Sequence, residues 1–321
     1  MKSTLPPFES LLKSREVEDP VNLWFNRPLA YAFVWLVYRT RTTPNQVTVL
    51  SMLVGVTAAA CWLAGTPVAM VAGGILLWGA GILDGADGIL ARAKSMQSEF
   101  GRALDGSLDL VVAAVSVTAA LLHLWSKHHD AWLLLAVVPA FGLTIGHVYL
   151  YDFYKESYLR MTRPGRGGEC EEVEQVEARV HRLESAGAHW FVRFVMRDLY
   201  VPVLRGERWL VEQTNPAALD TAVRGGARGS EPTASVYRAL NAGPMRLWTL
   251  VSLAPHTYLI SICAMMDRLD VYLWVRLVAM NVLFVAALIW QRRATERSLV
   301  ALTRPLPTAQ PVGHVARVAR S

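Results

Sequence analysis

Residues 84–109 read DGADGILARAKSMQSEFGRALDGSLD, and the arrangement of the whole chain follows from them. They place four aspartates in an otherwise apolar neighbourhood as two pairs, Asp84 with Asp87 and Asp105 with Asp109. The members of a pair are three or four residues apart, so on a helix each pair shares one face. Four converging carboxylates repel one another and lose hydration unless a cation joins them. Because hard divalent cations prefer carboxylate oxygens, the pattern predicts a site for one or two ions such as Mg²⁺, Mn²⁺ or Ca²⁺.

Small and basic residues accompany the aspartates. Gly88, Ala91 and Gly101 leave room for a ligand or for a second backbone to approach closely. Arg92 and Lys94 add positive charge, and an arginine binds two phosphate oxygens at once. Carboxylates for a metal, small residues for access and an arginine for an anion together indicate a diphosphate site.

The spacing D-x-x-D-G-x-x-A-R-x₈-G-x-x-x-D-x-x-x-D resembles the signature of the CDP-alcohol phosphotransferases, also called CDP-alcohol phosphatidyltransferases. The chain fills all eight specified places: Asp84, Asp87, Gly88, Ala91, Arg92, Gly101, Asp105 and Asp109. The competing interpretation, helix caps together with solvated acidic residues, does not account for so many fixed identities at fixed spacings.

The resemblance implies an enzyme that moves a phospho-alcohol from a CDP-alcohol to an acceptor hydroxyl, releases CMP and acts in phospholipid biosynthesis. It implies a divalent cation, Mg²⁺ or Mn²⁺, in a two-metal site. Asp84, Asp87 and Asp105 would be the chief ligands, with Asp109 at the metal edge and also acting as the general base for the acceptor's proton. A homodimer is implied by the resemblance alone.

Smaller roles are expected for other residues near the motif. Gly88, Ala91 and Gly101 would make room for cytidine, while Arg92 would steady phosphate. In the stretch TPNQVTVLS, residues 43–51, Thr43 or Asn45 is a helix cap with Pro44 in the first turn. The family often carries a Pro-Asn…Thr element here, which suggests instead that Asn45 and Thr48 line the nucleotide pocket.

The composition is that of a membrane protein. Of the 321 residues, 53% are hydrophobic and only 18% are charged, and the formal net charge is +6. Soluble domains carry about 25% charged residues. The excess of arginine fits a cytoplasmic face beside anionic lipid, and no nucleic-acid-binding motif accompanies it, so membrane lipids rather than nucleic acid are the expected partners. The sequence thus predicts an all-α, polytopic membrane protein.

Six apolar segments, several of about the length that crosses a bilayer, follow an N-terminal helix predicted to lie along the membrane interface. The segments are residues 47–63, 67–83, 108–125, 132–151, 247–266 and 271–290. Basic residues gather beside the motif and after Tyr154 and Trp290, and few occur in the opposite connections. This asymmetry predicts that both termini and the active site are cytoplasmic.

The expected organisation has five parts. They are a cytoplasmic N-terminus with the interfacial amphipathic helix at 1–42, spans one to four with the motif at 43–151, a cytoplasmic insertion at 152–246, spans five and six at 247–291, and a cytoplasmic tail at 292–321. Residues 1–42 carry no pattern of a secretory signal.

The insertion is either a solvated elaboration or a lid that binds the acceptor. The sequence predicts a helix break at 164–169, a charged helix at 171–187, a basic aromatic helix at 190–213 and a flexible loop at 224–235. Three basic residues just after span four are candidates for an anionic acceptor or a lipid headgroup. They are Lys155, Arg160 and Arg163.

Three polar residues inside the spans are functional candidates by position. His147 is a candidate to face the pocket, and His256, which follows Pro255, is a candidate to satisfy backbone groups freed by the proline. Arg276 would snorkel to the membrane surface or pair with Asp270.

Two other classes of protein compete with the enzyme. A cation transporter would place its acidic residues near the middle of the bilayer, whereas these aspartates are predicted at one end of a span beside glycine and arginine. A catalytically silent membrane scaffold would not need all eight motif positions. The sequence alone does not disclose the acceptor alcohol, nor whether the donor carries a lipid or a small headgroup.

Overall fold

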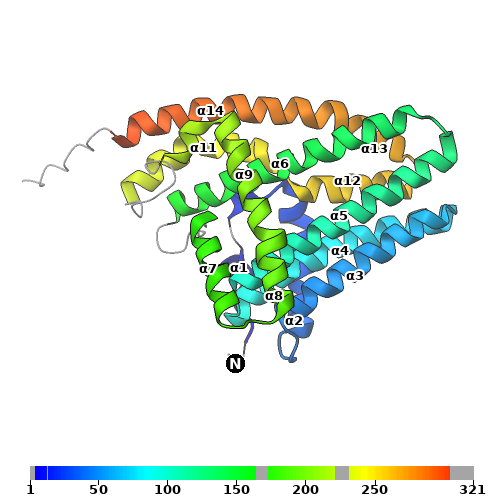
Figure 1. Cartoon of the computed structure of the whole chain (residues 1–321), viewed down its shortest axis with the longest axis horizontal. Coiled ribbons are helices and arrows are strands. Elements are labelled where there is room, and N and C mark those ends of the chain that lie inside the picture. The colour runs from blue at the N-terminus through cyan, green and yellow to red at the C-terminus, as the bar shows by residue number, and fades with distance from the viewer. Residues whose placement is uncertain (1–3, 13, 164–172, 221–230, 304–321) are drawn as a thin grey trace, which may run out of the picture.

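The computed structural model describes residues 4–12, 14–163, 173–220 and 231–303, and these ranges contain helices and no strand. Six helical segments within them are long and apolar enough to cross a membrane. The first four are α3 (Pro44–Ala64), α4 (Pro67–Lys94), α5 (Glu99–His128) and α6 (Trp132–Thr162). The expected all-α, multi-pass membrane architecture is confirmed, and Figure 1 shows the long helices side by side.

The fifth and sixth spans are each interrupted. The fifth joins α11 (Glu231–Thr249) to α12 (Leu253–Met265), and the sixth joins α13 (Leu269–Trp274), the π-helical η5 (Val275–Ala279) and α14 (Met280–Thr303). The predicted segment 247–266 is therefore not one regular helix, because helical geometry breaks between Thr249 and Leu253. The last helix also continues well beyond Trp290.

Local sequence explains where the first hairpin of spans begins and turns. The Thr43 hydroxyl accepts a hydrogen bond from the Gln46 amide, and the Gln46 side chain accepts one from the Thr43 amide, which together form a capping box. Gly65 ends α3 in a left-handed conformation with φ of 66°, where a side chain would be strained. Thr66 then caps α4, whose first residue is Pro67.

Glycines let the spans approach closely. A Cβ atom on Gly73 of α4 would lie 2.5 Å from the Trp62 ring and 2.8 Å from the Ala58 carbonyl oxygen, both on α3. A Cβ on Gly74 would lie 2.7 Å from the Ser261 carbonyl oxygen of α12. This close contact buries Trp62 completely and fixes α4 between α3 and α12.

The N-terminal segment packs against the helix that carries the first aspartate pair. Ala30 and Val34 of α2 (Arg27–Val37) are buried in one hydrophobic cluster with Ile89 and Leu90 of α4. The opposite face of α2 exposes Trp35, whose exposed fraction is 67%. A helix with one face on the bundle and aromatic residues on the other is consistent with the predicted interfacial helix.

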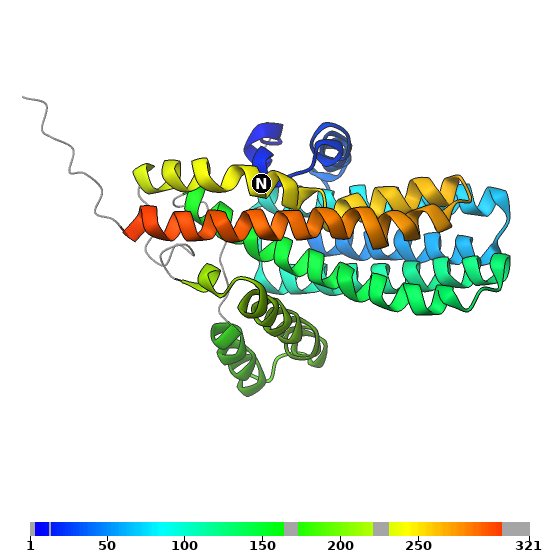
Figure 2. The ribbon, with the colours of Figure 1, turned by 90° about the horizontal axis from the view of Figure 1, so that it is seen from above.

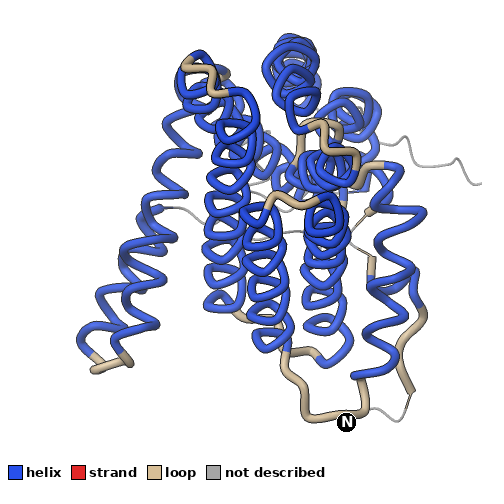
Figure 3. The backbone as a smooth tube through the Cα atoms, turned by 90° about the vertical axis from the view of Figure 1, so that its right-hand side faces the viewer, coloured by secondary structure: helices blue, strands red, loops and turns tan. Residues whose placement is uncertain are grey.

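A helical hairpin leaves the bundle on the flank opposite the N-terminal segment (Figures 2 and 3). It consists of α7 (Val173–Ser185), α8 (Trp190–Phe194), the π-helical η3 (Val195–Tyr200) and α9 (Val201–Thr214). Both helices expected in the insertion are present. The loop expected at 224–235 is wrong for residues 231–235, which begin α11, whereas residues 224–230 and the helix break at 164–169 lie outside the described residues.

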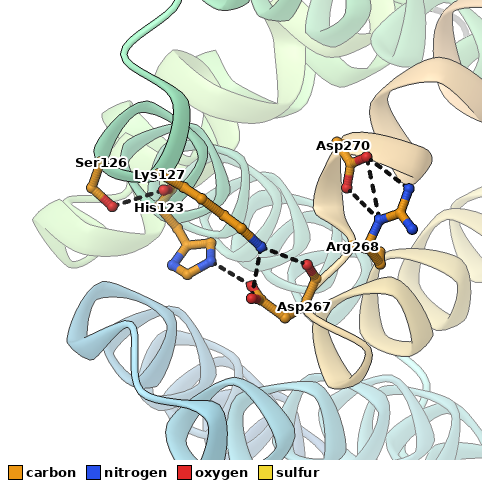
Figure 4. A network of polar contacts seen from close by, with 6 residues as sticks. All are labelled: His123, Ser126, Lys127, Asp267, Arg268 and Asp270. Carbon is orange, nitrogen blue, oxygen red and sulfur yellow. Dashed lines mark hydrogen bonds and ion pairs between the residues drawn. The ribbon is translucent and has the colours of Figure 1, made fainter.

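The turns at 64–67, 128–132 and 265–269 lie together at one end of the bundle, which we call the far end (Figure 1). There, Asp267 occupies the turn between α12 and α13 with φ of 52°. Its carboxylate accepts hydrogen bonds from His123 Nε2 at 2.8 Å and Lys127 Nζ at 2.7 Å, both on α5 (Figure 4). This network ties the third span to the start of the sixth.

Candidate active site

Three of the four motif aspartates meet at the junction of α4 and α5. Asp84 lies on α4, and Asp105 and Asp109 lie one turn apart on α5. One carboxylate oxygen from each lies within 4.8 Å of the others. The two helices form consecutive antiparallel spans, so the final part of α4 faces the first turns of α5 (Figure 1).

Asp87 has a different environment. It is 6% exposed and lies outside the group of three. The hydroxyl of Thr48 on α3 makes a short hydrogen bond to its carboxylate, and the same hydroxyl lies 3.2 Å from the Pro44 carbonyl oxygen. Thr48 therefore holds a motif carboxylate from the neighbouring span.

Of the predicted glycines, Gly101 lies in a tighter environment than Gly88. A Cβ atom on Gly101 would lie 3.3 Å from Asn45 Oδ1 and 3.0 Å from the Ser98 hydroxyl. A Cβ on Gly88 would lie 3.4 Å from Arg92 Nη1. Gly101 thus admits the Asn45 side chain beside α5, and Gly88 lies beside the arginine guanidinium.

One cavity of about 560 Å³ joins most of these residues. Its lining includes six of the predicted site residues: Asp84, Asp87, Gly88, Arg92, Asp105 and Asp109. Four others do not line it: Asn45, Thr48, Ala91 and Gly101. Asn45 and Thr48 instead lie next to motif residues from α3: Asn45 beside Gly101, and Thr48 bonded to Asp87. The Ala91 carbonyl oxygen accepts a hydrogen bond from the Met96 amide at the end of α4.

The N-terminal segment supplies charged residues that the motif did not predict. The Arg27 Nε donates to Glu18 at 2.7 Å, and its Nη1 donates to the Gly85 carbonyl oxygen at 3.1 Å. Burial lowers the pKa of Arg27, but the Glu18 carboxylate outweighs burial and holds that pKa above its ordinary value. Both residues line the cavity, as does Arg92, whose Nε donates to the Leu11 carbonyl oxygen at 2.6 Å.

No local signal in the sequence identifies the role of Arg27, because its contact with Gly85 spans 58 positions. The one related feature of the sequence is the glycine at position 85, because a Cβ atom there would lie 2.6 Å from Arg27 Nη1.

The donor set fits a hard divalent cation. Three carboxylates supply oxygen ligands, and Asp105 Oδ1 is buried without a hydrogen-bond partner among the described residues. An unpaired carboxylate oxygen in a low-dielectric site is unfavourable unless a cation or a proton neutralises it. Oxygen-only ligation favours Mg²⁺, Mn²⁺ or Ca²⁺ over Zn²⁺.

Of the three basic residues expected to bind an anionic acceptor, one lines the cavity. Lys155 does so, and it pairs closely with Asp152 and lies 3.9 Å from Glu156. Arg160 and Arg163 are absent from the cavity lining. A phosphate at this position would therefore have to compete with two carboxylates for the lysine.

The expectation for Arg276 was wrong, and the candidate His147 does not line the cavity. Arg276 is buried and neither snorkels nor pairs with Asp270, which instead forms an ion pair with Arg268 at 3.1 Å. Arg276 Nη1 lies 3.2 Å from His256 Nε2, and it also lies 3.5 Å from His147 Nδ1. His147 packs within this group and is absent from the cavity lining.

Comparison with known proteins adds an independent observation. Residues 41–162 match the model of the CDP-alcohol phosphatidyltransferase family, which covers α3 to α6 and the carboxylate cluster. The chain is 32% identical over 137 residues to the bifunctional IPC transferase and DIPP synthase of Thermococcus kodakarensis, a match that covers 40% of this chain and 30% of that protein. It is 40% identical over 82 residues to the protein of the same name from Aquifex aeolicus, covering 26% and 18%. The chain thus spans less than a third of the length of each of these relatives.

Proposed function

Residues 41–162 match the model of the CDP-alcohol phosphatidyltransferase family, and from this similarity we propose that the protein transfers a phospho-alcohol from a CDP-alcohol to an acceptor hydroxyl and releases CMP. The observation that carries the proposal is the cluster of Asp84, Asp105 and Asp109 on the wall of a cavity that is also lined by two half-buried arginines, Arg27 and Arg92. A diphosphate needs both kinds of group, because cations neutralise its charge and arginines orient its oxygens.

Asp84, Asp105 and Asp109 would hold the divalent cation, with Asp87 beside them on the cavity wall. When bound, Mg²⁺ or Mn²⁺ supplies neutralisation of the diphosphate's negative charge. The chain contributes the fixed geometry, since two of the carboxylates come from one helix and the third from its neighbour. Thr48 keeps Asp87 oriented through its hydroxyl.

Asp109 is the proposed general base. In the transfer, its carboxylate accepts the proton of the acceptor hydroxyl while the acceptor oxygen forms a new bond to the phosphorus of the phospho-alcohol. The bond between that phosphorus and the bridging oxygen breaks, and CMP leaves with the bridging oxygen and its negative charge. The product is a phosphodiester.

Arg92 and Arg27 are placed to orient phosphate oxygens. Both guanidiniums are anchored from the N-terminal segment, Arg92 by the Leu11 carbonyl oxygen and Arg27 by Glu18. Fixing an arginine before the substrate arrives reduces the entropy lost on binding. Gly88 lies beside the Arg92 guanidinium, where an added Cβ atom would make an ordinary contact at 3.4 Å from Nη1.

Several further features belong to the same proposal. The reaction serves phospholipid biosynthesis, both termini and the active site face the cytoplasm, and the protein is a homodimer. Within the insertion at 152–246, the helical hairpin of α7, α8, η3 and α9 packs against the start of α5, where Ala103 shares a hydrophobic cluster with Val176 and Val195. A cation transporter is less well supported, because the carboxylates lie close to one end of α4 and α5.

The test is CMP release by the purified full chain, supplied with Mg²⁺ or Mn²⁺ and a panel of CDP-alcohols and acceptors. We expect release that requires metal, donor and acceptor together and that is lost in Asp109→Asn. Asp270→Asn, which removes an acidic group at the far end, is the matched control and should retain the wild-type rate. Absence of both nucleotide binding and metal binding in the wild type would contradict the proposal.

A further inference from the structure

The cavity continues from the carboxylates into the bundle and reaches a second polar region. Ser116 of α5, Thr144 of α6 and Arg276 of η5 all line this cavity, and Arg276 contacts two further lining residues, Ala140 of α6 and His256 of α12. Arg276 is 3% exposed and lies seven residues into the sixth span, which at a helical rise of 1.5 Å is about 10 Å from its start. A guanidinium therefore occupies the interior of the membrane-spanning bundle.

The charge of this guanidinium is not balanced by the surrounding protein. Arg276 has no ion pair with an acidic residue in the described part of the chain, and the closest acid in sequence, Asp270, is paired with Arg268. Charged side chains inside a membrane are unfavourable by several kcal/mol and are normally paired or face a water-filled cavity.

The hydrogen bonds show that the two histidines beside Arg276 do not add charge. The Asn281 amide group donates to the Arg276 and Leu277 carbonyl oxygens at 3.2 Å and 2.9 Å, so its oxygen is the acceptor for His147 Nε2 at 3.1 Å. The other nitrogen of His147 faces Arg276, which has no acceptor, and must therefore carry a lone pair. The same reasoning applies to His256 Nε2, so both imidazoles are neutral acceptors.

These neighbours leave part of the guanidinium without an acceptor. Its Nη1 faces the two histidines, and its Nη2 donates to the Ala140 carbonyl oxygen at 2.8 Å. An arginine has five N–H donors, so the Nε hydrogen and the second Nη2 hydrogen have no acceptor among the described residues. These donors lie on neighbouring nitrogens, and guanidinium N–H groups of this kind bind the oxygens of an anion.

A second polar group on the same cavity also has no partner. The Ser116 hydroxyl is buried without a hydrogen bond among the described residues, and Ser116 is 4% exposed. Ser116 lies seven residues after Asp109 on one face of α5, about 10 Å further along the helix. A buried hydroxyl without a partner is unfavourable, so it indicates a polar occupant.

From these observations we infer that the inner end of the cavity binds a monovalent anion, held by Arg276 with Ser116 as a further donor. The anion neutralises the buried guanidinium and accepts hydrogen bonds from its remaining N–H groups. Two sources offer the required chemistry: a small inorganic anion, or the carboxylate of an amphiphile whose chain lies along apolar wall residues such as Val117 and Val137. This site is distinct from the carboxylate cluster and does not depend on the proposed transferase activity.

The test uses the full chain in an uncharged detergent, with sodium gluconate as the starting salt. At constant ionic strength, gluconate is replaced stepwise by bromide in one arm, and sodium octanoate is added in another, while the thermal unfolding midpoint is recorded. We expect a saturable rise of about 5 °C or more at a hundredfold excess over the dissociation constant. Saturation by bromide identifies the inorganic source, and saturation by octanoate alone identifies the amphiphile.

Two variants and one control complete the design. Arg276→Gln removes the charge and should lose the anion-dependent rise, while Ser116→Ala should fold as the wild type does and bind the anion several-fold more weakly. Arg268→Gln, which alters an exposed arginine at the far end, should keep the full response. If Arg276→Gln does not fold, the inference is tested by the wild-type titration and by the weaker anion binding expected of Ser116→Ala. A wild-type midpoint that responds to neither salt would overturn the inference, as would an unchanged response in a folded Arg276→Gln.

Discussion

The Thr48 hydroxyl on α3 hydrogen-bonds the Asp87 carboxylate on α4, joining the first span to the aspartate motif. Thr48→Val keeps the shape of the side chain but leaves the buried carboxylate without this donor. We expect it to reduce the free energy of unfolding by about 1–3 kcal/mol and to weaken metal binding. Chemical denaturation and Mn²⁺ titration measure the two effects. Thr48→Ser retains the hydroxyl and should behave like the wild type, and equal losses in both variants would contradict this role.

The contact between α3 and α4 depends on the absence of a side chain at Gly73. An alanine there would place Cβ against the Trp62 ring and against the Ala58 carbonyl oxygen, and the backbone oxygen cannot rotate away. We expect Gly73→Ala to destabilise the protein by about 1–3 kcal/mol. Gly79→Ala on the same helix meets no atom within 4 Å and should be neutral or stabilising. Thermal unfolding of the two variants compares them, and a stable Gly73→Ala would show that the spans separate easily.

Removing one member of the Glu18–Arg27 ion pair should lower the free energy of unfolding more than replacing both members by neutral residues. Arg27→Gln leaves Glu18, whose side chain is 6% exposed, without its cation, and we expect a loss of about 3–5 kcal/mol in the free energy of unfolding. Combining it with Glu18→Gln should recover much of that loss, because no uncompensated charge then remains. A double-mutant cycle by chemical denaturation measures the coupling. Strictly additive losses would mean that the two groups do not act as a pair.

The far end should respond to acid through Asp267. Partial burial raises the pKa of Asp267, but hydrogen bonds from Lys127 and His123 outweigh it and hold the pKa below its ordinary value of 3.8. A lowered folded-state pKa contributes stability above the unfolded value, and this contribution is lost as the pH falls through the folded-state pKa.

We therefore expect the difference in unfolding midpoint between wild type and Asp267→Asn to be largest near pH 6 and to shrink below about pH 4. Asparagine is the suitable replacement because it tolerates the positive φ at this turn. Asp270→Asn provides a comparison at an acid outside this network. A wild-type advantage that is constant from pH 6 to pH 3 would contradict the assignment.

Sequence spacing predicted the group of Asp84, Asp105 and Asp109, because helical periodicity places each pair on one face and consecutive spans bring the faces together. Arg276 could not be placed in this way. Sequence proximity suggested Asp270, but Arg268 binds that carboxylate at the turn, while the π-helical η5 directs Arg276 toward α6 and α12. Pairings set by the packing of distant helices leave no local signal.

The contacts of the N-terminal segment with α4 could not be predicted from the sequence either. Residues near the start of the chain were expected to form an interfacial helix, and α2 does present Trp35 outward. The contact of Arg27 with Gly85 depends on how α2 packs against α4, which composition does not reveal. Likewise, residues 231–235 have the composition of a loop but begin α11, since packing overrides their weak helix propensity.

The central claim is that the carboxylate cluster binds the metal that supports CMP release. The most direct measurement follows Mn²⁺ binding by electron paramagnetic resonance and CMP release from a CDP-alcohol in the same samples, for the wild type and for Asp105→Asn. We expect binding and release to saturate together in the wild type and both to be lost in the variant, which should remain folded. CMP release that persists in Asp105→Asn, or that proceeds in the wild type without bound metal, would contradict it.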